Sequence, residues 1–170
     1  MDIKTTFVYL MFNYELVVDK KYMSDIIHNN TGRRDERLAS VITETCNKYK
    51  FNNKDCAIYN NILFAESSYR LNMVNKKTKD YCMAQINHTH KVNKQKALTN
   101  LQYCLEEGIK ILSYFKRRFK KSEAHWFGRY NCGTRSSCLS RPKTKKYINK
   151  ILSGIIAHKK EDKKILATNP

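Results

Sequence analysis

The stretch Ile58–Ser67, which reads IYNNILFAES, decides the class of the fold and carries the most unusual side chain of the sequence. Apolar side chains recur there with the period of an α-helix, at Ile58, Tyr59, Ile62, Leu63 and Phe64. Glu66 follows Ile62 by four residues, so a carboxyl group falls on the apolar stripe of this helix. A carboxyl group that loses water without gaining a cationic partner has a raised pKa.

Glu66 has two interpretations. In the structural one, the side chain lies at the edge of the stripe and reaches solvent, or caps a neighbouring helix. The segment alone favours this interpretation, because perturbed carboxyl groups are common in structural networks. In the functional one, the side chain supplies a proton near neutral pH to a reaction. The other segments of the chain have to distinguish the two.

Composition indicates one folded, helix-rich domain with an anionic partner. The chain has 170 residues, 41% of them hydrophobic, and only 5 Gly and 2 Pro. A formal charge of +18 implies binding to nucleic acid, to anionic cell-wall polymers or to lipid headgroups. No apolar stretch approaches the roughly 18 residues that a transmembrane helix needs. The apolar run at residues 7–12 is short and interrupted, so we expect an N-terminal helix rather than an export signal.

Six cysteines form an even set, as in the disulfide frameworks of proteins from oxidising compartments. Fifteen pairings are possible, and a local bridge between Cys132 and Cys138 is sterically plausible. The cysteines and histidines lack the spacing of a zinc site, so we expect neither a metal nor a cofactor. The cysteines point to a location outside the cytoplasm, although the N-terminal segment does not supply the export route.

The remaining pattern predicts helices around one hairpin or loop. We expect a helix over residues 35–49, a cap at Asn52 and Asn53 that opens the Glu66 helix, and a loop or short hairpin over residues 72–80. Leucines and isoleucines at steps of three and four predict a single amphipathic helix over residues 97–119. A last ordered unit follows at residues 123–133, then a cysteine-closed loop and a basic helix. The expected fold class is mainly α.

Four short blocks resemble, in the right order, the soluble lytic transglycosylases and goose-type lysozymes, and are closest to small members associated with secretion and conjugation machineries. The blocks are AES at residues 65–67, DYCMAQIN at 80–87, NLQYCLEEGIKIL at 100–112 and WFGRYNCGT at 126–134. Each block is short, and their order and separation carry the resemblance. Glu66 precedes Gln85 by 19 residues, and Gln85 precedes Tyr130 by 45, as in that family.

The resemblance implies a lysozyme-like single domain over residues 36–150, with a short loop or small hairpin beside the catalytic cleft. Residues 1–35 would then be an N-terminal extension and residues 151–170 a basic C-terminal helix or tail. It also implies a monomer that cleaves peptidoglycan glycan strands at the cell wall, in the periplasm or outside the cell, within a secretion or conjugation complex or as a phage lysin. Glu66 would act first as acid and then as base, giving 1,6-anhydromuramyl ends.

The resemblance also implies roles for other residues. Ser67 and Gln85 would hydrogen-bond the sugar or hold Glu66, Tyr130 would contact the glutamate or the saccharide, and Asn131 would shape the same wall. Each also has a structural interpretation: Ser67 bonds within its helix, Gln85 lies on a surface, and Tyr130 belongs to the core. We favour function for Gln85 and Tyr130, and for Ser67 and Asn131 the two interpretations are even.

Asp80 keeps a hydrolytic, lysozyme-like mechanism as the alternative. It lies where true lysozymes can hold a second carboxylate, and ordinary glycosidases use two. Aspartate also enters turns readily, and after KKTK we favour that interpretation. If Asp80 instead faces the cleft beside Glu66, hydrolysis gains support.

One departure from the family concerns Cys82, which stands where the family has glycine. We expect its side chain to narrow the groove or to impose another backbone angle, because glycine tolerates a positive φ better than cysteine.

A nucleic-acid-binding protein is the rival from another functional class. Aromatic residues interleave with Lys and Arg in ILSYFKRRFKK, residues 111–121. An amphipathic helix with a cationic end explains that stretch more simply, so we do not expect nucleic acid as the partner. A catalytically inactive wall-binding module is a further alternative, which the intact Glu66 disfavours.

Overall fold

The computed structural model describes the backbone of residues 17–168 and the side chains of residues 17–155. Helices dominate this part of the chain, and one small antiparallel sheet has the strand order β1-β2-β3, so the mainly α class is confirmed. The elements are α2 (Lys20–Thr31), α3 (Glu36–Lys48), α4 (Asn53–Ser67), β1 (Val74–Asn75), β2 (Asp80–Tyr81), β3 (Ile86–Asn87), η1 (His88–His90), α5 (Lys94–Thr99), α6 (Leu101–Phe119), η2 (Trp126–Gly128), α7 (Arg129–Cys132) and α8 (Pro142–Thr168). None of these helices is long and apolar enough to cross a membrane. The helix expected at residues 7–12 lies outside the described residues.

Side-chain caps begin the two helices that were predicted most closely. The Asp35 carboxylate accepts a hydrogen bond from the Leu38 amide (2.9 Å) and starts α3. The Asn52 side chain accepts one from the Asp55 amide (2.9 Å) and starts α4. Each satisfies an amide that has no partner inside its own helix. The predictions of a helix near residues 35–49 and of a cap before the Glu66 helix are confirmed.

The prediction of a single helix over residues 97–119 is wrong, because the helix is interrupted at Asn100. This residue has an extended backbone (φ −119°, ψ 106°), so α5 ends before it. Its side chain then accepts a hydrogen bond from the Tyr103 amide (2.9 Å) and caps α6. The apolar periodicity continues across the break and therefore conceals it, whereas a capping asparagine inside a helical pattern was the available signal.

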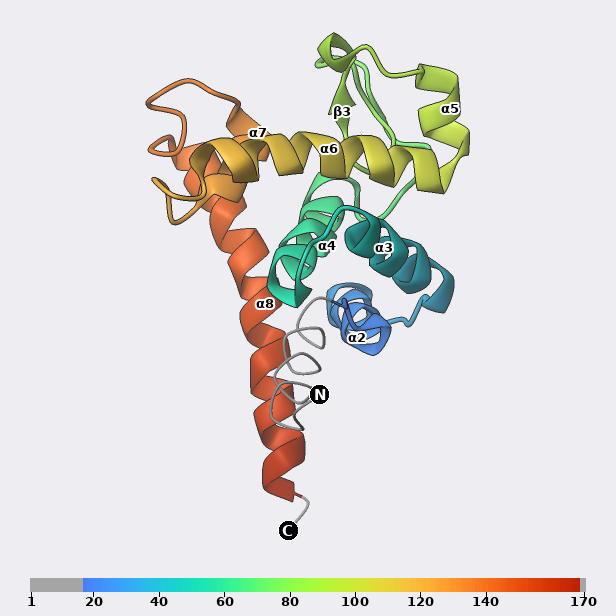
Figure 1. Ribbon diagram of the computed structural model, residues 1–170, viewed down its shortest axis with the longest axis vertical. Coiled ribbons are helices and arrows are strands. Elements are labelled where there is room, and N and C mark those ends of the chain that lie inside the picture. The colour runs from blue at the N-terminus through green and yellow to red at the C-terminus, as the bar shows by residue number, and fades with distance from the viewer. Residues whose placement is uncertain (1–16, 169–170) are drawn as a thin grey trace, which may run out of the picture.

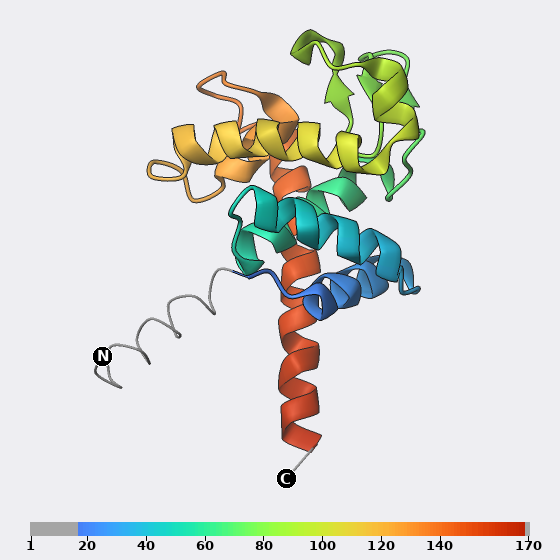
Figure 2. The ribbon, with the colours of Figure 1, turned by 45° about the vertical axis from the view of Figure 1, so that its right-hand side comes forward.

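Helix α4 lies at the centre of the fold. It packs against α2, α3 and α8, while α6 lies across one end of this group, with the sheet and α5 near one end of α6 and α7 near the other (Figure 1). Met23, Ile26 and Ile27 of α2 are buried in the same core. Helix α2, from the expected N-terminal extension, therefore contributes to the core, and α8 continues past residue 150. In Figure 2 the second half of α8 extends away from the other elements.

All six cysteines are paired, which confirms the disulfide framework. Cys46–Cys56 joins α3 to α4, and Cys82–Cys104 joins the turn between β2 and β3 to α6. Cys132–Cys138 closes the loop after α7, as the spacing had suggested. Three bridges fit a protein of an oxidising compartment.

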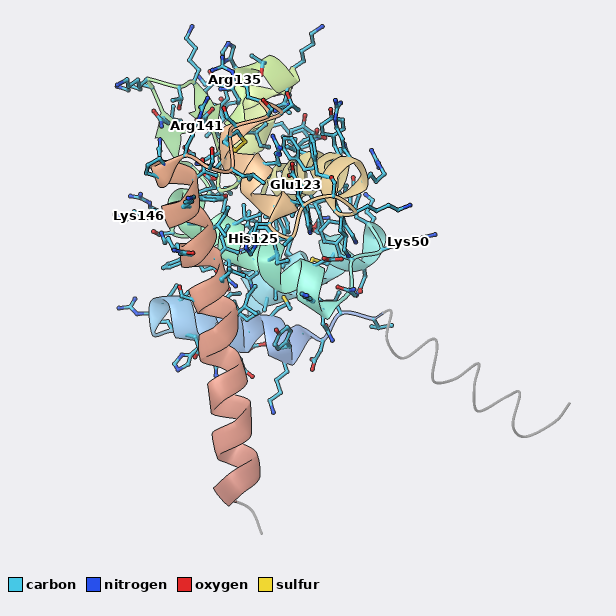
Figure 3. The ribbon with its side chains drawn as sticks, turned by 90° about the vertical axis from the view of Figure 1, so that its left-hand side faces the viewer. Lys50, Glu123, His125, Arg135, Arg141 and Lys146 are labelled. Atoms are coloured by element: carbon cyan, nitrogen blue, oxygen red, sulfur yellow. A yellow bond between two sulfur atoms is a disulfide. The ribbon has the colours of Figure 1, made fainter. Side chains whose placement is uncertain are left out.

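A buried arginine holds the loop that Cys138 closes. Arg129 is 3% exposed, and its side chain pairs with Glu123 (Nε to Oε2, 2.9 Å) and donates to the carbonyl oxygens of Gly133 (3.2 Å) and Arg135 (2.6 Å). Glu123 and Arg135 are labelled in Figure 3. The Arg129 side chain is thus held by Glu123 on one side and by the closed loop on the other. We infer that these bonds also hold the backbone of the next residue, Tyr130.

Candidate active site

Glu66 lies in the last turn of α4, where the chain leaves the core. The helix ends at Ser68, which adopts a left-handed backbone (φ 53°) and donates its amide to Phe64 O. The Glu66 side chain is partly buried and lines a cavity of about 410 Å³. Helix termination thus places a carboxyl group at the boundary between the core and an open cavity.

The structure brings five of the six predicted site residues to this one cavity. Its walls come from α4, from the sheet and its turns, from α6, from α7 and from the first turns of α8. The predicted residues among its lining are Glu66, Asp80, Gln85, Tyr130 and Asn131. The first and last of these positions are 65 residues apart in sequence, so the fold and not local proximity brings them together.

The pKa of Glu66 is raised to about 7. Burial is the largest cause, and the negative charge of Asp80 acts in the same direction. A hydrogen bond from the Tyr147 hydroxyl to Glu66 Oε1 (2.8 Å), together with the charges of Lys143 and Lys150, lowers the pKa and limits the rise. Loss of water dominates because no cation forms an ion pair with Glu66 among the described residues.

Tyr147 is the site residue that the sequence did not reveal. It lies on α8, 81 residues from Glu66, and only the packing of α8 against α4 brings the two together. Burial raises the Tyr147 pKa well above its ordinary value, and the nearby Glu66 adds to the effect, so its hydroxyl stays protonated and donates. One signal existed in the sequence: Lys143, Tyr147 and Lys150 share a helix face at steps of four and three.

Gln85 lines the cavity from a tight turn. Its backbone has a positive φ (47°), and its side-chain amide donates to the carbonyl oxygens of Cys82 (2.8 Å) and Met73 (3.4 Å). These bonds fix the side chain against the turn rather than against Glu66. Gln85 is thus half-buried on the cavity wall, with its amide group bonded to its own turn.

Cys82 corrects the expectation attached to the missing glycine. Its φ is 63°, so the left-handed backbone typical of glycine is retained and no other angle is imposed. Its side chain is fully buried and bonded to Cys104, so it does not line the cavity or narrow it. The covalent bond to α6 holds the conformation that cysteine alone disfavours.

Tyr130 forms a wall of the cavity, and its hydroxyl donates to Ala84 O (2.8 Å) rather than to Glu66. The contact needs a close approach to α6, which Gly108 permits. A Cβ atom at Gly108 would lie 2.7 Å from both Ala84 Cβ and the Tyr59 hydroxyl oxygen, and 3.3 Å from the Tyr130 hydroxyl oxygen. Gly108 thus sets the distance between α6 and the turn that bears Gln85.

Asp80 lies in strand β2 and not in the turn that we favoured from the sequence. The turn occupies residues 76–79, and Asp80 pairs with Asn75 and Asn87 in the ladders on either side. Its Oδ1 accepts a hydrogen bond from Asn87 Nδ2 (2.7 Å), and its Oδ2 accepts one from the Thr78 hydroxyl. The hairpin that was one of two expectations for residues 72–80 is what turns this carboxylate into the cavity.

Ser67 is the predicted residue that the structure does not bring to the cavity. Its side chain is buried, and its hydroxyl donates to Leu63 O (3.1 Å) within α4, which is the structural alternative. Asn131 lies on the cavity wall next to Tyr130. Asn131 thus lies where the resemblance places it, on the wall of the cavity, whereas Ser67 is not positioned to contact a sugar there.

The cavity offers a proton donor active near neutral pH, a second carboxylate and several amides. Within the described residues, no three His, Cys, Asp or Glu side chains come together in a way that could hold a metal ion. Searches among protein-family models, curated proteins and solved structures find no match to this chain. The geometry and chemistry of the cavity are therefore the basis for assigning a function.

Proposed function

We propose that the protein cleaves the β-1,4 bond between N-acetylmuramic acid and N-acetylglucosamine in peptidoglycan and leaves 1,6-anhydromuramyl ends. The observation that carries this proposal is Glu66, a carboxyl group with a pKa of about 7 on the wall of a polar cavity. Glycosidic cleavage needs such a group, because the leaving oxygen has to receive a proton as the bond breaks. The order of the four sequence blocks that resemble lytic transglycosylases agrees with this chemistry.

In the first step Glu66 donates its proton to the glycosidic oxygen. The bond between this oxygen and the anomeric carbon breaks, its electron pair goes to the oxygen, and positive charge develops on the sugar. In the second step the Glu66 carboxylate accepts the proton of the muramyl 6-hydroxyl while that oxygen bonds to the anomeric carbon. The acid is regenerated and no water is consumed.

Tyr147 fits a supporting role in both steps. Its hydroxyl donates to Glu66 Oε1, and this bond is strongest when Glu66 is ionised between the two steps. It also fixes the orientation of the carboxyl group. Because Tyr147 acts through Glu66, we assign it as a positioning residue.

The rest of the cavity suits a saccharide. Amide side chains such as Asn131 and Gln85 can accept and donate hydrogen bonds to hydroxyl and acetamido groups. Ile111 and Tyr130 add apolar surface beneath them. A small number of polar groups on such walls is what orients a bound ligand.

Hydrolysis with Asp80 as the second carboxylate is the other candidate, and the position of Asp80 on the same cavity favours it. Its two oxygens already accept hydrogen bonds from Asn87 and Thr78, so fewer of their lone pairs are left for a water molecule or a sugar. We therefore keep the single-glutamate reaction as the main proposal. Mass spectrometry of the products separates the two, because hydrolysis adds a water molecule that the anhydro product lacks.

The direct test is clearing of purified cell walls by the wild-type chain and by Glu66→Gln, followed by product analysis. Glu44→Gln is the matched control, because Glu44 is an exposed glutamate of α3. We expect clearing by the wild type and the control only. Equal clearing by Glu66→Gln would exclude Glu66 from the reaction, and salt-sensitive DNA binding without any clearing would favour the nucleic-acid-binding alternative.

We further place the site of action at the cell wall, in the periplasm or outside the cell. Three disulfides support an oxidising compartment, and the net charge of +18 suits an anionic wall. A secretion or conjugation complex, or a phage lysis pathway, would bring the enzyme to this substrate.

A further inference from the structure

A second cavity, about 450 Å³ in volume, lies between the carboxyl-terminal half of α6 and the segment from Tyr49 to Phe51. We call it the basic groove. Five cations from α6 and the turn that follows it line the groove: Lys110, Lys116, Arg117, Lys120 and Lys121. No acidic side chain belongs to its lining. The groove therefore presents positive charge in a concave site.

Ion pairs with two carboxylates neutralise part of this charge. Asp55, which is 2% exposed, pairs with Lys116 (2.6 Å) and with Lys120 (3.3 Å), and Glu107 pairs with Lys110 (2.5 Å). No ion pair is found for Arg117 or Lys121 among the described residues. Five cations thus face two carboxylates, and the excess charge has no partner in this part of the chain.

Ser113 supplies a second, independent observation. Its hydroxyl oxygen is buried and has no hydrogen-bond partner among the described residues, although it lines the groove. Buried polar atoms in proteins are nearly always hydrogen-bonded, so an unpaired one calls for a ligand or a bound water. A hydroxyl beneath a set of cations is a suitable donor to an anionic oxygen.

The basic groove is separate from the Glu66 cavity. Lys110 and Arg117 are seven residues apart and so share one face of α6. Ile111, which lines the Glu66 cavity, is turned about 100° away on the same helix. Lys50, between Tyr49 and Phe51 in the chain, projects outward at the edge of the molecule in Figure 3 and adds positive charge near the groove.

We propose that the basic groove binds a phosphodiester-linked polymer of the cell wall and so holds the enzyme on its substrate. Phosphate oxygens are the acceptors that Arg and Lys bind most strongly. A rigid duplex is wide compared with a groove of about 450 Å³, whereas a flexible polymer chain can enter it. That the polymer is one of the cell wall rests on the proposed function.

The test measures how much protein co-sediments with purified walls. All chains carry Glu66→Gln, so that cleavage of the wall does not affect the result. Walls that carry their phosphodiester polymer are compared with walls stripped of it by hydrofluoric acid. The test variant is Arg117→Glu/Lys121→Glu, which leaves the two lysines that pair with Asp55 unchanged. The control is Arg33→Glu/Arg37→Glu, two exposed arginines outside both cavities, with the same change in net charge.

We expect the test variant to bind intact walls about tenfold more weakly than the parent, since at least one charge-assisted hydrogen bond is lost. The control variant should stay within about twofold, and stripped walls should bind all three chains equally weakly. If the test and control variants bound intact walls equally weakly, net charge alone would explain the effect. The proposal that the groove binds the polymer would then be wrong. Tighter binding of single-stranded DNA than of soluble poly(glycerol phosphate) would assign it to nucleic acid instead.

A separate measurement keeps the two proposals apart. With Glu66 intact, Arg117→Glu/Lys121→Glu should clear stripped walls at the wild-type rate and intact walls more slowly. If the wild type clears neither kind of wall, the proposed reaction is wrong, while the binding result still decides whether the groove takes a phosphodiester. If it clears both and the variant matches it on both, the groove has no part in holding the wall.

Discussion

The two ends of helix α4 carry two carboxyl groups in contrasting environments. Asp55 in the first turn is 2% exposed and has two ammonium groups within 3.3 Å, from Lys116 and Lys120. Glu66 in the last turn also loses water to burial, but its hydrogen-bond partner is a neutral tyrosine hydroxyl. One end of the helix thus neutralises its carboxylate, and the other keeps a proton on it.

We interpret this difference as the one between a structural carboxylate and the proposed general acid. Direct ion pairs offset the loss of water at Asp55 and tie α4 to α6. At Glu66 the nearest cations act only through space, so burial determines the protonation state. A partly buried carboxyl group without an ion pair costs stability, and such a cost is typical of functional sites. The following predictions test the contrast, from the largest expected effect to the smallest.

Glu66→Gln should reduce wall clearing by about a thousandfold or more, because a general acid that also acts as base is lost. Asp55→Asn should leave the clearing rate per folded molecule within about threefold of the wild type. Initial rates, corrected for the folded fraction, measure both. A large loss of activity in folded Asp55→Asn would remove the functional distinction between the two ends.

Stability should show the reverse pattern. Asp55→Asn leaves Lys116 and Lys120 above a buried site without their counterion, and should lower the free energy of unfolding by about 3 kcal/mol. Asp25→Asn is the control, because its pair with Arg34 is more exposed and should be worth under about 1 kcal/mol. Urea unfolding at pH 7 measures both changes. A cost at Asp55 no larger than that at Asp25 would contradict a structural role.

The pH dependence of stability should reveal the raised Glu66 pKa. Below pH 4 the carboxyl group is protonated in both the folded and the unfolded chain. As pH rises from 4.5 to about 7, the unfolded chain loses the proton while the folded one retains it, so the wild type loses stability relative to Glu66→Gln. The relative loss should reach at most about 3 kcal/mol at pH 8. Parallel unfolding curves for the two proteins from pH 4 to 8 would refute it.

Tyr147→Phe should produce the smallest change, a displaced pH profile. The hydroxyl stabilises the Glu66 carboxylate, so its removal raises the Glu66 pKa and moves the alkaline limb of the clearing rate upward by up to about one pH unit. Tyr114→Phe is the control, since Tyr114 is exposed on α6. A uniform fall in rate with an unmoved limb would reduce Tyr147 to a packing residue.

Local chemistry made much of the fold predictable. Asp35 and Asn52 are capping residues that mark helix starts with a defined hydrogen bond, and both helices begin there. The apolar stripe before Glu66 indicated a buried helix, and the raised pKa of Glu66 followed from that burial. In each case the evidence lies within one or two turns of sequence.

Features that depend on packing were not predictable in the same way. The bond from Tyr147 to Glu66 needs α8 to lie against α4, and the buried Arg129 needs Glu123 and the closed loop around it. The left-handed backbone at Cys82 depends on the pairing with Cys104, one of fifteen possible pairings. Asp80 was assigned to a turn because only the sheet register shows that it faces the cavity.

The Cys82–Cys104 bridge makes the proposed activity depend on the redox state of the compartment that contains the chain. It anchors to α6 the turn that bears Gln85, so in a chain whose thiols stay reduced this wall of the cavity has no covalent link to α6. Comparing Cys82→Ser/Cys104→Ser with Cys46→Ser/Cys56→Ser, per folded molecule, should show a larger activity loss in the first. With that result, the proposed wall-cleaving activity would stay low in the reducing interior of the cell that makes the chain and would rise once the bridge forms in an oxidising compartment.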